Sequence, residues 1–283
     1  MKQLILFAAL AAVTILSSCK KDDNGGATTY TITVTDDGHG TATAVVGGIV
    51  VSQAKAGDQV TLEATPNAKY EFKKWTTGGF VLAPSNTTAT PATFTMPSAH
   101  ISIKAEFAHV DGVMINGILW AKYNVDAFGT FAATPESFGM LYQWNRKKAW
   151  PATDTPATGW DSSTPSGESW EEANDPCPAG WRVPTESELS TLCETGKVTH
   201  LEAPLNGVNG ATFTDKTTNA SIFIPYAGYR YDGSGNFGSV ASNDYVWSAT
   251  AFSSYVGYGL SVYGGAMGNG NRSDGFSVRC VAE

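Results

Sequence analysis

The 283-residue chain is poor in charged residues, and basic residues are the scarcer kind. Only 16% of the residues are charged, with 18 Lys and Arg against 26 Asp and Glu, which gives a formal net charge of −8. Nucleic-acid binding needs a basic stripe to meet the phosphates, so nucleic acid is excluded as a partner. The chain has 30 glycines, 11 tyrosines and 8 tryptophans. This composition is typical of a secreted, loop-rich β protein.

The sequence also lacks the motifs of the common catalytic and metal sites. It has no nucleophile-elbow pattern, no metal-binding helix motif and no Cys or His pair at zinc spacing. The four histidines, His39, His100, His109 and His200, stand isolated. Scattered Asp and Asn leave calcium open, although no EF-hand-like spacing exists. We therefore expect a protein that is not an enzyme, with no cofactor and no metal site.

The N-terminal segment predicts export and lipidation. Its apolar run, Leu4 to Leu16, is too short to span a bilayer and indicates a signal peptide over residues 1–18. Leu16-Ser17-Ser18-Cys19 resembles a bacterial lipobox, in which Cys19 is acylated. Lys20-Lys21-Asp22-Asp23 is similar to the export signal of outward-facing Bacteroidetes lipoproteins. The resemblance implies a lipidated tether over 19–28 and a surface-exposed protein at the outer membrane, which it contacts through the lipid alone. A plain secretory signal and a solvated charged tether are the alternatives.

Residues 29–108 show one strand pattern after another. Apolar and polar residues alternate in Tyr30 to Thr35, Val60 to Ala64 and Ile101 to Phe107, with glycine-containing turns between them. The segments AGDQVTLEATPNAKYEFKKW and FTMPSAHISIKAEF resemble the divergent internalin-type B-repeat family. The resemblance implies a small β module that acts as a spacer or as a weak adhesion domain. We favour the spacer.

The second half of the chain is organised around residues 175–185, DPCPAGWRVPT. Thr185 and Glu188 form a capping box, which predicts a helix start. Leu189, Leu192 and Cys193 then share one face, and Gly196 suits the helix end. Near the C-terminus, residues 275–281 alternate as a strand with one buried face. An earlier strand is predicted over residues 113–123.

These segments resemble the FISUMP (Fibrobacter succinogenes major paralogous) domain. The likeness rests on DPCPAGWRVPTESEL, YVWSATA and GFSVRCV, with ILWAKYNV and FGMLYQW as earlier blocks. It implies an α+β fold similar to C-type lectins over residues 109–283. Cys177 and Cys280 lie in two of these blocks, and the resembled fold brings them close, so a disulfide between them is implied, with Cys193 buried and free. Three free thiols are the alternative. The paired cysteines of the related formylglycine-generating proteins are missing, so that chemistry should be absent.

A candidate binding face follows from composition near the C-terminus. Tyr, Ser, Gly and Asn dominate Ala251 to Arg272, as they do in antibody binding loops. If Leu260 and Val262 face the core, Gly259, Ser261 and Tyr263 point outward. Trp160 and Trp170, in a long loop, either stack on sugars or anchor the loop, and we favour anchors. The predicted ligand-binding residues are Phe252, Ser253, Ser254, Tyr255, Tyr258, Gly259, Ser261, Tyr263, Asn269, Asn271, Arg272 and Asp274.

The same region lacks four residue types altogether. Residues 252–279 contain no Lys, Glu, Gln or Trp, although these types make up 37 of the 283 residues and about four would be expected. Adenine-directed randomisation of Asn-type codons cannot produce any of the four. The pattern resembles the variable region of targets of diversity-generating retroelements. The alternative is an ordinary glycine-rich loop.

Together these observations predict a surface-anchored lipoprotein whose C-terminal domain binds a protein or glycan ligand in adhesion or capture. The competing hypothesis is a structural subunit of an envelope or pilus-like assembly. The sequence does not name the ligand, because a fold resemblance alone does not supply one.

Overall fold

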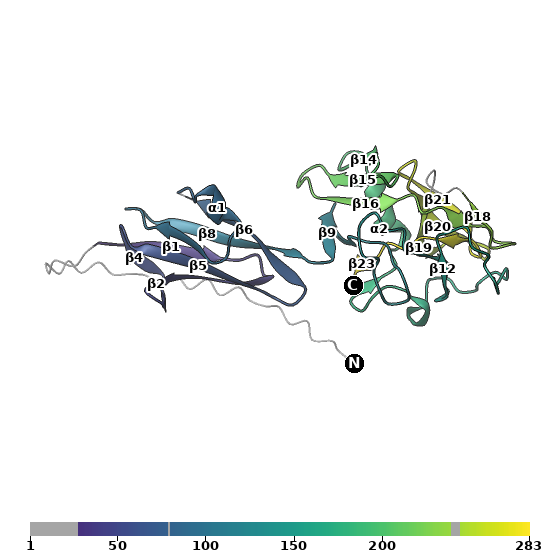
Figure 1. Cartoon of the computed structure of the whole chain (residues 1–283), viewed down its shortest axis with the longest axis horizontal. Coiled ribbons are helices and arrows are strands. Elements are labelled where there is room, and N and C mark those ends of the chain that lie inside the picture. The colour runs from purple at the N-terminus through teal and green to yellow at the C-terminus, as the bar shows by residue number, and fades with distance from the viewer. Residues whose placement is uncertain (1–27, 79, 239–243) are drawn as a thin grey trace.

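The computed structural model describes residues 28–78, 80–238 and 244–283. They form two domains placed end to end (Figure 1). The predicted signal peptide, the lipidation site Cys19 and residues 20–27 of the tether lie outside the described residues. Within the described residues, no helix has the length and apolar character needed to cross a bilayer.

The first domain consists of two four-stranded sheets packed face to face. One sheet has the order β4-β1-β8-β6 and the other β3-β2-β5-β7. The strands are β1 (Thr29–Thr35), β2 (Gly40–Val46), β3 (Ile49–Val50), β4 (Gln53–Lys55), β5 (Gln59–Pro66), β6 (Tyr70–Gly78), β7 (Ala92–Thr95) and β8 (Ile101–His109), and one helical turn, α1, covers Pro84–Thr87.

The predicted strands of this domain are confirmed, since they lie within β1, β5 and β8. Their alternation places Ile32, Leu62 and Ile103 in one core cluster, where all three are buried. Trp75 fills the same core and donates from Nε1 to Ala89 O at 2.9 Å. The period-two pattern thus fixes which face of each strand points between the sheets.

The described residues of the second domain are also mainly β and form four small sheets. Their orders are β13-β23-β10-β9, β12-β11-β22-β17-β18, β14-β15-β16 and β19-β20-β21. The strands are β9 (Gly112–Ile115), β10 (Ile118–Ala121), β11 (Met140–Gln143), β12 (Ala149–Pro151), β13 (Trp181–Arg182), β14 (Val198–Glu202), β15 (Gly210–Asp215), β16 (Ser221–Pro225), β17 (Tyr229–Arg230), β18 (Phe237–Gly238), β19 (Tyr245–Ala251), β20 (Val256–Ser261), β21 (Ala266–Asn271), β22 (Gly275–Phe276) and β23 (Val281–Ala282). The described helices are α2 (Glu186–Ser190) and the 3-10 turns η1 (Glu172–Asn174) and η2 (Thr191–Cys193).

Two strand predictions in this domain are wrong in detail. The single strand expected over residues 113–123 is a hairpin, β9–β10, because Asn116 and Gly117 adopt positive φ angles of 46° and 81° and reverse the chain. Asn-Gly is a strong hairpin signal. The C-terminal strand expected over 275–281 is divided into β22 and β23, and residues 275–281 are all buried, so the strand has no solvent face.

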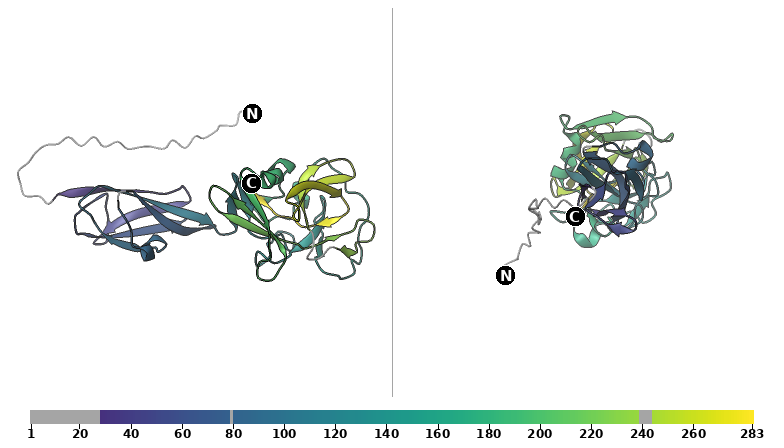
Figure 2. Two further views of the ribbon diagram at one scale, coloured as in Figure 1. Left: turned by 90° about the horizontal axis from the view of Figure 1, so that it is seen from above. Right: turned by 90° about the vertical axis from the view of Figure 1, so that its left-hand side faces the viewer.

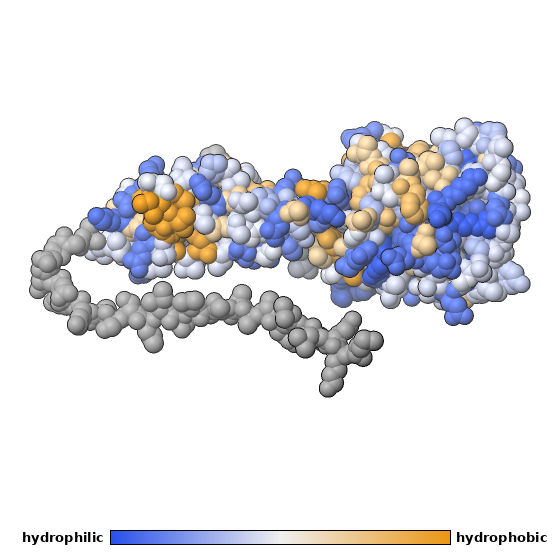
Figure 3. Space-filling view, turned by 90° about the horizontal axis from the view of Figure 1, so that it is seen from below, coloured by the Kyte–Doolittle hydropathy of each residue, from blue (hydrophilic) through white to orange (hydrophobic). Residues whose placement is uncertain are grey.

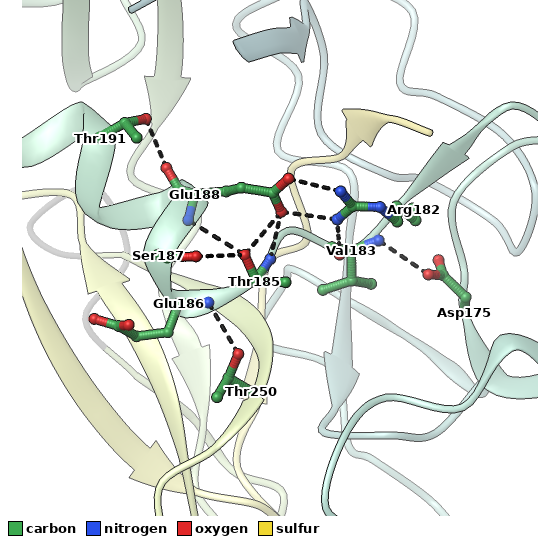
Figure 4. Close-up of polar contacts among 9 residues, drawn as sticks. All are labelled: Asp175, Arg182, Val183, Thr185, Glu186, Ser187, Glu188, Thr191 and Thr250. Carbon is green, nitrogen blue, oxygen red and sulfur yellow. Dashed lines mark hydrogen bonds and ion pairs between the residues drawn. The ribbon is translucent and has the colours of Figure 1, made fainter. Parts of the chain in front are cut away.

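The helix predicted at Thr185 is confirmed, with its capping box (Figure 4). Thr185 Oγ1 accepts from Glu188 N, and Glu188 Oε2 accepts from Thr185 N at 2.8 Å. Arg182 adds a two-pronged contact, donating to the same carboxylate at 2.8 and 2.6 Å. The α-helix ends at Ser190 and continues as η2, which keeps Leu189 and Leu192 in the core.

The signature segment, which is residues 175–185, is covalently linked to the C-terminal part of the chain. Cys177 and Cys280 form a disulfide between residues 103 positions apart, as the family resemblance implied. Asp175 supports the segment by accepting from the backbone amides of Cys177 and Val183, both at 2.9 Å. Cys193 is free and half-buried, and burial raises the pKa of its thiol to about 11.

The two domains are joined end to end (Figures 1 and 2), and residues on either side of the junction are in direct contact. The His109 ring packs edge-on against Trp181 at 5.3 Å and against Tyr70 at 5.0 Å. Lys69 Nζ donates to Ala179 O at 3.2 Å. Because these contacts join side chains on both sides of a short connection, the first domain holds the second in an extended arrangement.

Candidate functional site

The sheet β19-β20-β21 carries five of the twelve predicted binding residues, and its central strand has buried residues on both faces. Leu260 and Val262 lie in the core, as expected. The prediction that Gly259 points outward is wrong: a Cβ atom there would lie 3.0 Å from Val246 O. Gly257 lies on the same face of the strand, where a Cβ would approach the Trp144 ring to 2.8 Å, so packing requires glycine at both positions.

The connection between β19 and β20, residues 252–255, is exposed throughout. The side chains of Phe252 and Tyr255 are 55% and 68% exposed. Ser253 Oγ accepts from the amides of Tyr255 and Val256 at 3.3 and 3.2 Å, which holds the turn in shape. The Phe252 ring packs edge-on against Tyr258 at 5.1 Å. Two aromatic side chains are therefore presented on a hydrogen-bonded turn.

A cleft of about 650 Å³ opens between this turn and a second loop. The turn contributes residues 251–255 to one wall, and residues 164–168 form the other, with Arg272 between them. The loop is held by Asn145, whose Nδ2 donates to Ser166 O at 3.0 Å. Gly167 has a φ of +109°, and a Cβ there would lie 3.1 Å from Asn145 Nδ2. The site therefore consists of two fixed loops around a buried cation.

Arg272 links the two walls of the cleft. Its Nη1 donates to Pro165 O at 3.1 Å and to Gly167 O at 2.7 Å, and its Nη2 donates to Ser253 O at 2.6 Å. The guanidinium also stacks over Trp144, 4.1 Å from the ring centroid. Burial lowers the pKa of Arg272, which the nearby carboxylate of Glu168 opposes.

Arg272 is therefore different from the exposed contact residue that the sequence predicted. It is 2% exposed, and among the described residues its Nε has no hydrogen-bond partner. Its main role in the structure is to hold both loops. The sequence could not show this, because Pro165 O and Gly167 O belong to residues 107 and 105 positions earlier in the chain and are brought to Arg272 only by folding.

The remaining predicted residues lie outside the cleft. Tyr263 packs on Tyr226 beyond the other end of β20, with ring centroids 6.1 Å apart. Tyr258 and Asn269 are register partners within the sheet. The structure brings together Phe252, Ser253, Ser254, Tyr255 and Arg272, and it places Tyr258, Gly259, Ser261, Tyr263, Asn269, Asn271 and Asp274 elsewhere.

Asp274 belongs to a separate polar cluster next to the sheet. Its carboxylate accepts from the amides of Asp232 and Asn271, both at 2.9 Å. Burial, reinforced by the charge of Asp232, raises the pKa of Asp274 to about 6. Asn271 Nδ2 donates to Asp232 Oδ2 at 3.0 Å. Within the described residues, no three His, Cys, Asp or Glu side chains gather as metal ligands.

The two loop tryptophans are anchors, as we favoured. Trp170 is 8% exposed and donates from Nε1 to Asn174 O at 2.9 Å. Trp160 donates from Nε1 to Asp232 O at 2.6 Å and packs on Trp150 at 5.0 Å. The wall formed by residues 164–168 lies between these anchors. The sequence marked it only as a Pro, Ser, Thr and Gly-rich loop, so its part in the cleft was missed.

Comparison with known families now places both domains. The chain belongs to the Fibrobacter succinogenes major domain family, whose model matches residues 113–282. The model of the divergent InlB B-repeat domain matches residues 30–111. No curated protein and no solved structure matches the chain. The two matches together indicate a protein built from surface-protein domains.

Proposed function

We propose that this protein is a surface-anchored lipoprotein that binds a protein or glycan ligand in the cleft of its second domain. The observation that carries the proposal is a 650 Å³ cleft with exposed Phe252 and Tyr255 on one wall. Clefts of this size with a few placed polar groups are the usual form of binding sites. The proposed role is binding in adhesion or capture, without a catalytic step or cofactor.

The rigidity of the cleft supports this role. Arg272 ties both walls to one guanidinium, and Asn145 fixes the loop that carries Ser166. A ligand then meets walls that are already ordered, so less conformational entropy is lost on binding. Tyr and Phe add contact area at a small entropic cost, because each has only two side-chain torsions.

The charge of the cleft indicates the kind of ligand it accepts. The three hydrogen bonds of Arg272 go to backbone carbonyls, and the cation is buried. Glu168 supplies an exposed carboxylate on the opposite wall. With a net charge of −8 on the whole chain, we expect an uncharged or basic ligand to be favoured over an acidic one.

The first domain serves as the spacer in this proposal, and Cys19 carries the lipid at the outer membrane. Direct contact between the domains at His109 and Trp181 supports a spacer that keeps the cleft in a fixed orientation. The C-type-lectin-like arrangement of the second domain is part of the proposal, supported by the pairing of β10 with the C-terminal β23. Metabolic labelling with a fatty-acid analogue, lost in Cys19→Ala, tests the anchor.

The binding test uses soluble residues 20–283 on a glycan array and on a panel of envelope proteins. A Phe252→Ala, Tyr255→Ala double variant should lose at least about tenfold in affinity, as expected for two exposed aromatic anchors. Tyr263→Ala is the matched control, because Tyr263 is 53% exposed but lies outside the cleft. Equal loss in both variants, or no ligand at all, would favour the structural-subunit hypothesis.

The diversified-face hypothesis stays a prediction, and the structure offers a reason for the missing residue types. Gly257, Gly259 and residues 275–278 are buried, and long charged side chains are rarely buried without partners. Exposed positions such as Ser254 and Tyr255 remain free to vary. A template repeat near the gene with mismatches confined to adenines is the expected finding, and its absence would refute diversification.

A further inference from the structure

The first domain exposes an apolar turn that its own fold leaves uncovered. Ile49 and Val50 of β3 are 70% and 65% exposed. A hydrophobic patch is visible on this domain in the view from below (Figure 3). We call residues 45–51, Val-Val-Gly-Gly-Ile-Val-Val, the apolar turn. A contiguous exposed apolar patch on a soluble domain often marks an interaction surface.

The local sequence builds this turn and leaves it unprotected. Gly47 and Gly48 have φ angles of 58° and 84°, so they form a tight hairpin that pairs Val46 with Ile49. β3 is the outer strand of its sheet. Sheet edges usually carry charges or proline as protection, but no Lys, Arg, Asp, Glu or Pro occurs from Gly40 to Ala54.

The course of the chain places the turn in the half of the domain away from the second domain. β8 ends at the junction, and Gly40, where β2 begins, lies against Phe107 of β8. β2 runs back from there to Val46. Thr29, where the first strand begins, pairs with Lys55 in the same half. Thr29 follows Cys19 by ten positions in the chain, and a segment of that length spans at most about 36 Å.

We propose that the apolar turn rests on the bilayer that holds the anchor, with Ile49 and Val50 inserted among the lipid headgroups. The proposal rests on the anchoring part of the proposed function. Two aliphatic side chains bind a membrane weakly by themselves, but a short tether raises their effective concentration at the surface. β3 has only two residues, which is too short for stable edge pairing with a second copy. The spacer is thereby oriented on the membrane.

The test attaches residues 19–283 to phosphatidylcholine nanodiscs through a maleimide lipid at Cys19, so the anchor is supplied chemically. Cys177 and Cys280 are in a disulfide, and the raised pKa of the half-buried Cys193 keeps its thiol slow to react. Hydrogen exchange of amides in residues 40–52 is then compared between the attached and the free protein. We expect roughly tenfold slower exchange on attachment, from the burial of two aliphatic side chains.

Two variants make the result specific. Ile49→Ser with Val50→Ser should abolish the slowing. Val81→Ser should leave it unchanged, because Val81 is 91% exposed but precedes α1, which contacts β6 and β7, and β7 is the opposite edge of the sheet from β3. Unchanged exchange on attachment overturns the proposal.

Protection that rises with protein concentration in the free protein, together with a doubled mass, also overturns it in favour of a second copy. Both of these outcomes are distinguishable from a failure of the proposed function. The chemical anchor replaces cellular lipidation in this test, and the binding assay for the cleft uses no membrane.

Discussion

Replacing Glu188 by Gln removes one carboxylate that supports both the start of α2 and the signature segment before it (Figure 4). The Glu188 carboxylate accepts two hydrogen bonds from Arg182, at 2.8 and 2.6 Å. It also accepts from Thr185 N and Oγ1 at 2.8 and 2.9 Å. The glutamine keeps the shape and one acceptor oxygen but loses the charge.

The magnitude follows from the pKa. Hydrogen bonding from Arg182, and then from Thr185, lowers the pKa of Glu188 from 4.5 to about 2. That difference corresponds to about 3 kcal/mol at neutral pH, and to about 2 kcal/mol after allowance for a side chain that is 19% exposed. Because the folded-state pKa is the lower one, this stabilisation is fully present above about pH 4.5. It is lost as the pH falls through about 2.

Urea denaturation of the wild type and Glu188→Gln, followed by tryptophan fluorescence between pH 7 and pH 3, measures the effect. The variant should unfold with about 2 kcal/mol less free energy at pH 7, and the gap should shrink to about half by pH 3. Glu186→Gln is the control, since Glu186 lies in the same first turn, two residues before Glu188, and takes no part in the capping box. A gap that stays constant across this pH range would refute the reasoning.

Other predictions concern the disulfide, the glycines of the sheet and the cation of the cleft. Changing Cys177 and Cys280 to Ser should cost about 4 to 5 kcal/mol by chain entropy for a separation of 103 residues, measured by urea denaturation without reductant. Gly257→Ala should lower the free energy of unfolding by about 1 to 3 kcal/mol, because the new Cβ would lie 2.8 Å from a buried indole. The control Gly264→Ala, with open space around it, should change this free energy little, and equal effects of the two variants would count against the packing argument. Arg272→Lys should cost about 3 kcal/mol and weaken ligand binding, since one ammonium cannot reach three carbonyls; unchanged stability would show that the loops hold themselves.

The sequence by itself determined the elements that depend on interactions between residues close together in the chain. The alternation in Ile101 to Phe107 fixed a strand and its buried face, and the Thr185 and Glu188 spacing fixed a helix start. Both signals involve residues only a few positions apart, so they can be recognised without knowledge of the fold. The Asn116-Gly117 hairpin was equally local, and was missed because the apolar residues around it suggested one continuous strand.

The family blocks carried information over a longer range. They implied the disulfide between Cys177 and Cys280, which the structure contains. They also implied an α+β arrangement, whereas the described part of the second domain is mainly β with one five-residue α-helix. The capping box predicted where α2 begins, but periodicity did not predict that the α-helix ends at Ser190 and continues as a 3-10 turn with Leu192 buried.

Only the tertiary structure decided the candidate site. The sequence predicted that Tyr255 and Tyr263 belong to one binding face, yet they lie beyond opposite ends of β20. It could not show that residues 164–168 form the second wall, or that Arg272 is buried between the walls. The physical reason is that burial depends on which distant backbone carbonyls and indole rings approach a side chain. Those partners, about a hundred residues away along the chain, are set by the packing of the whole domain.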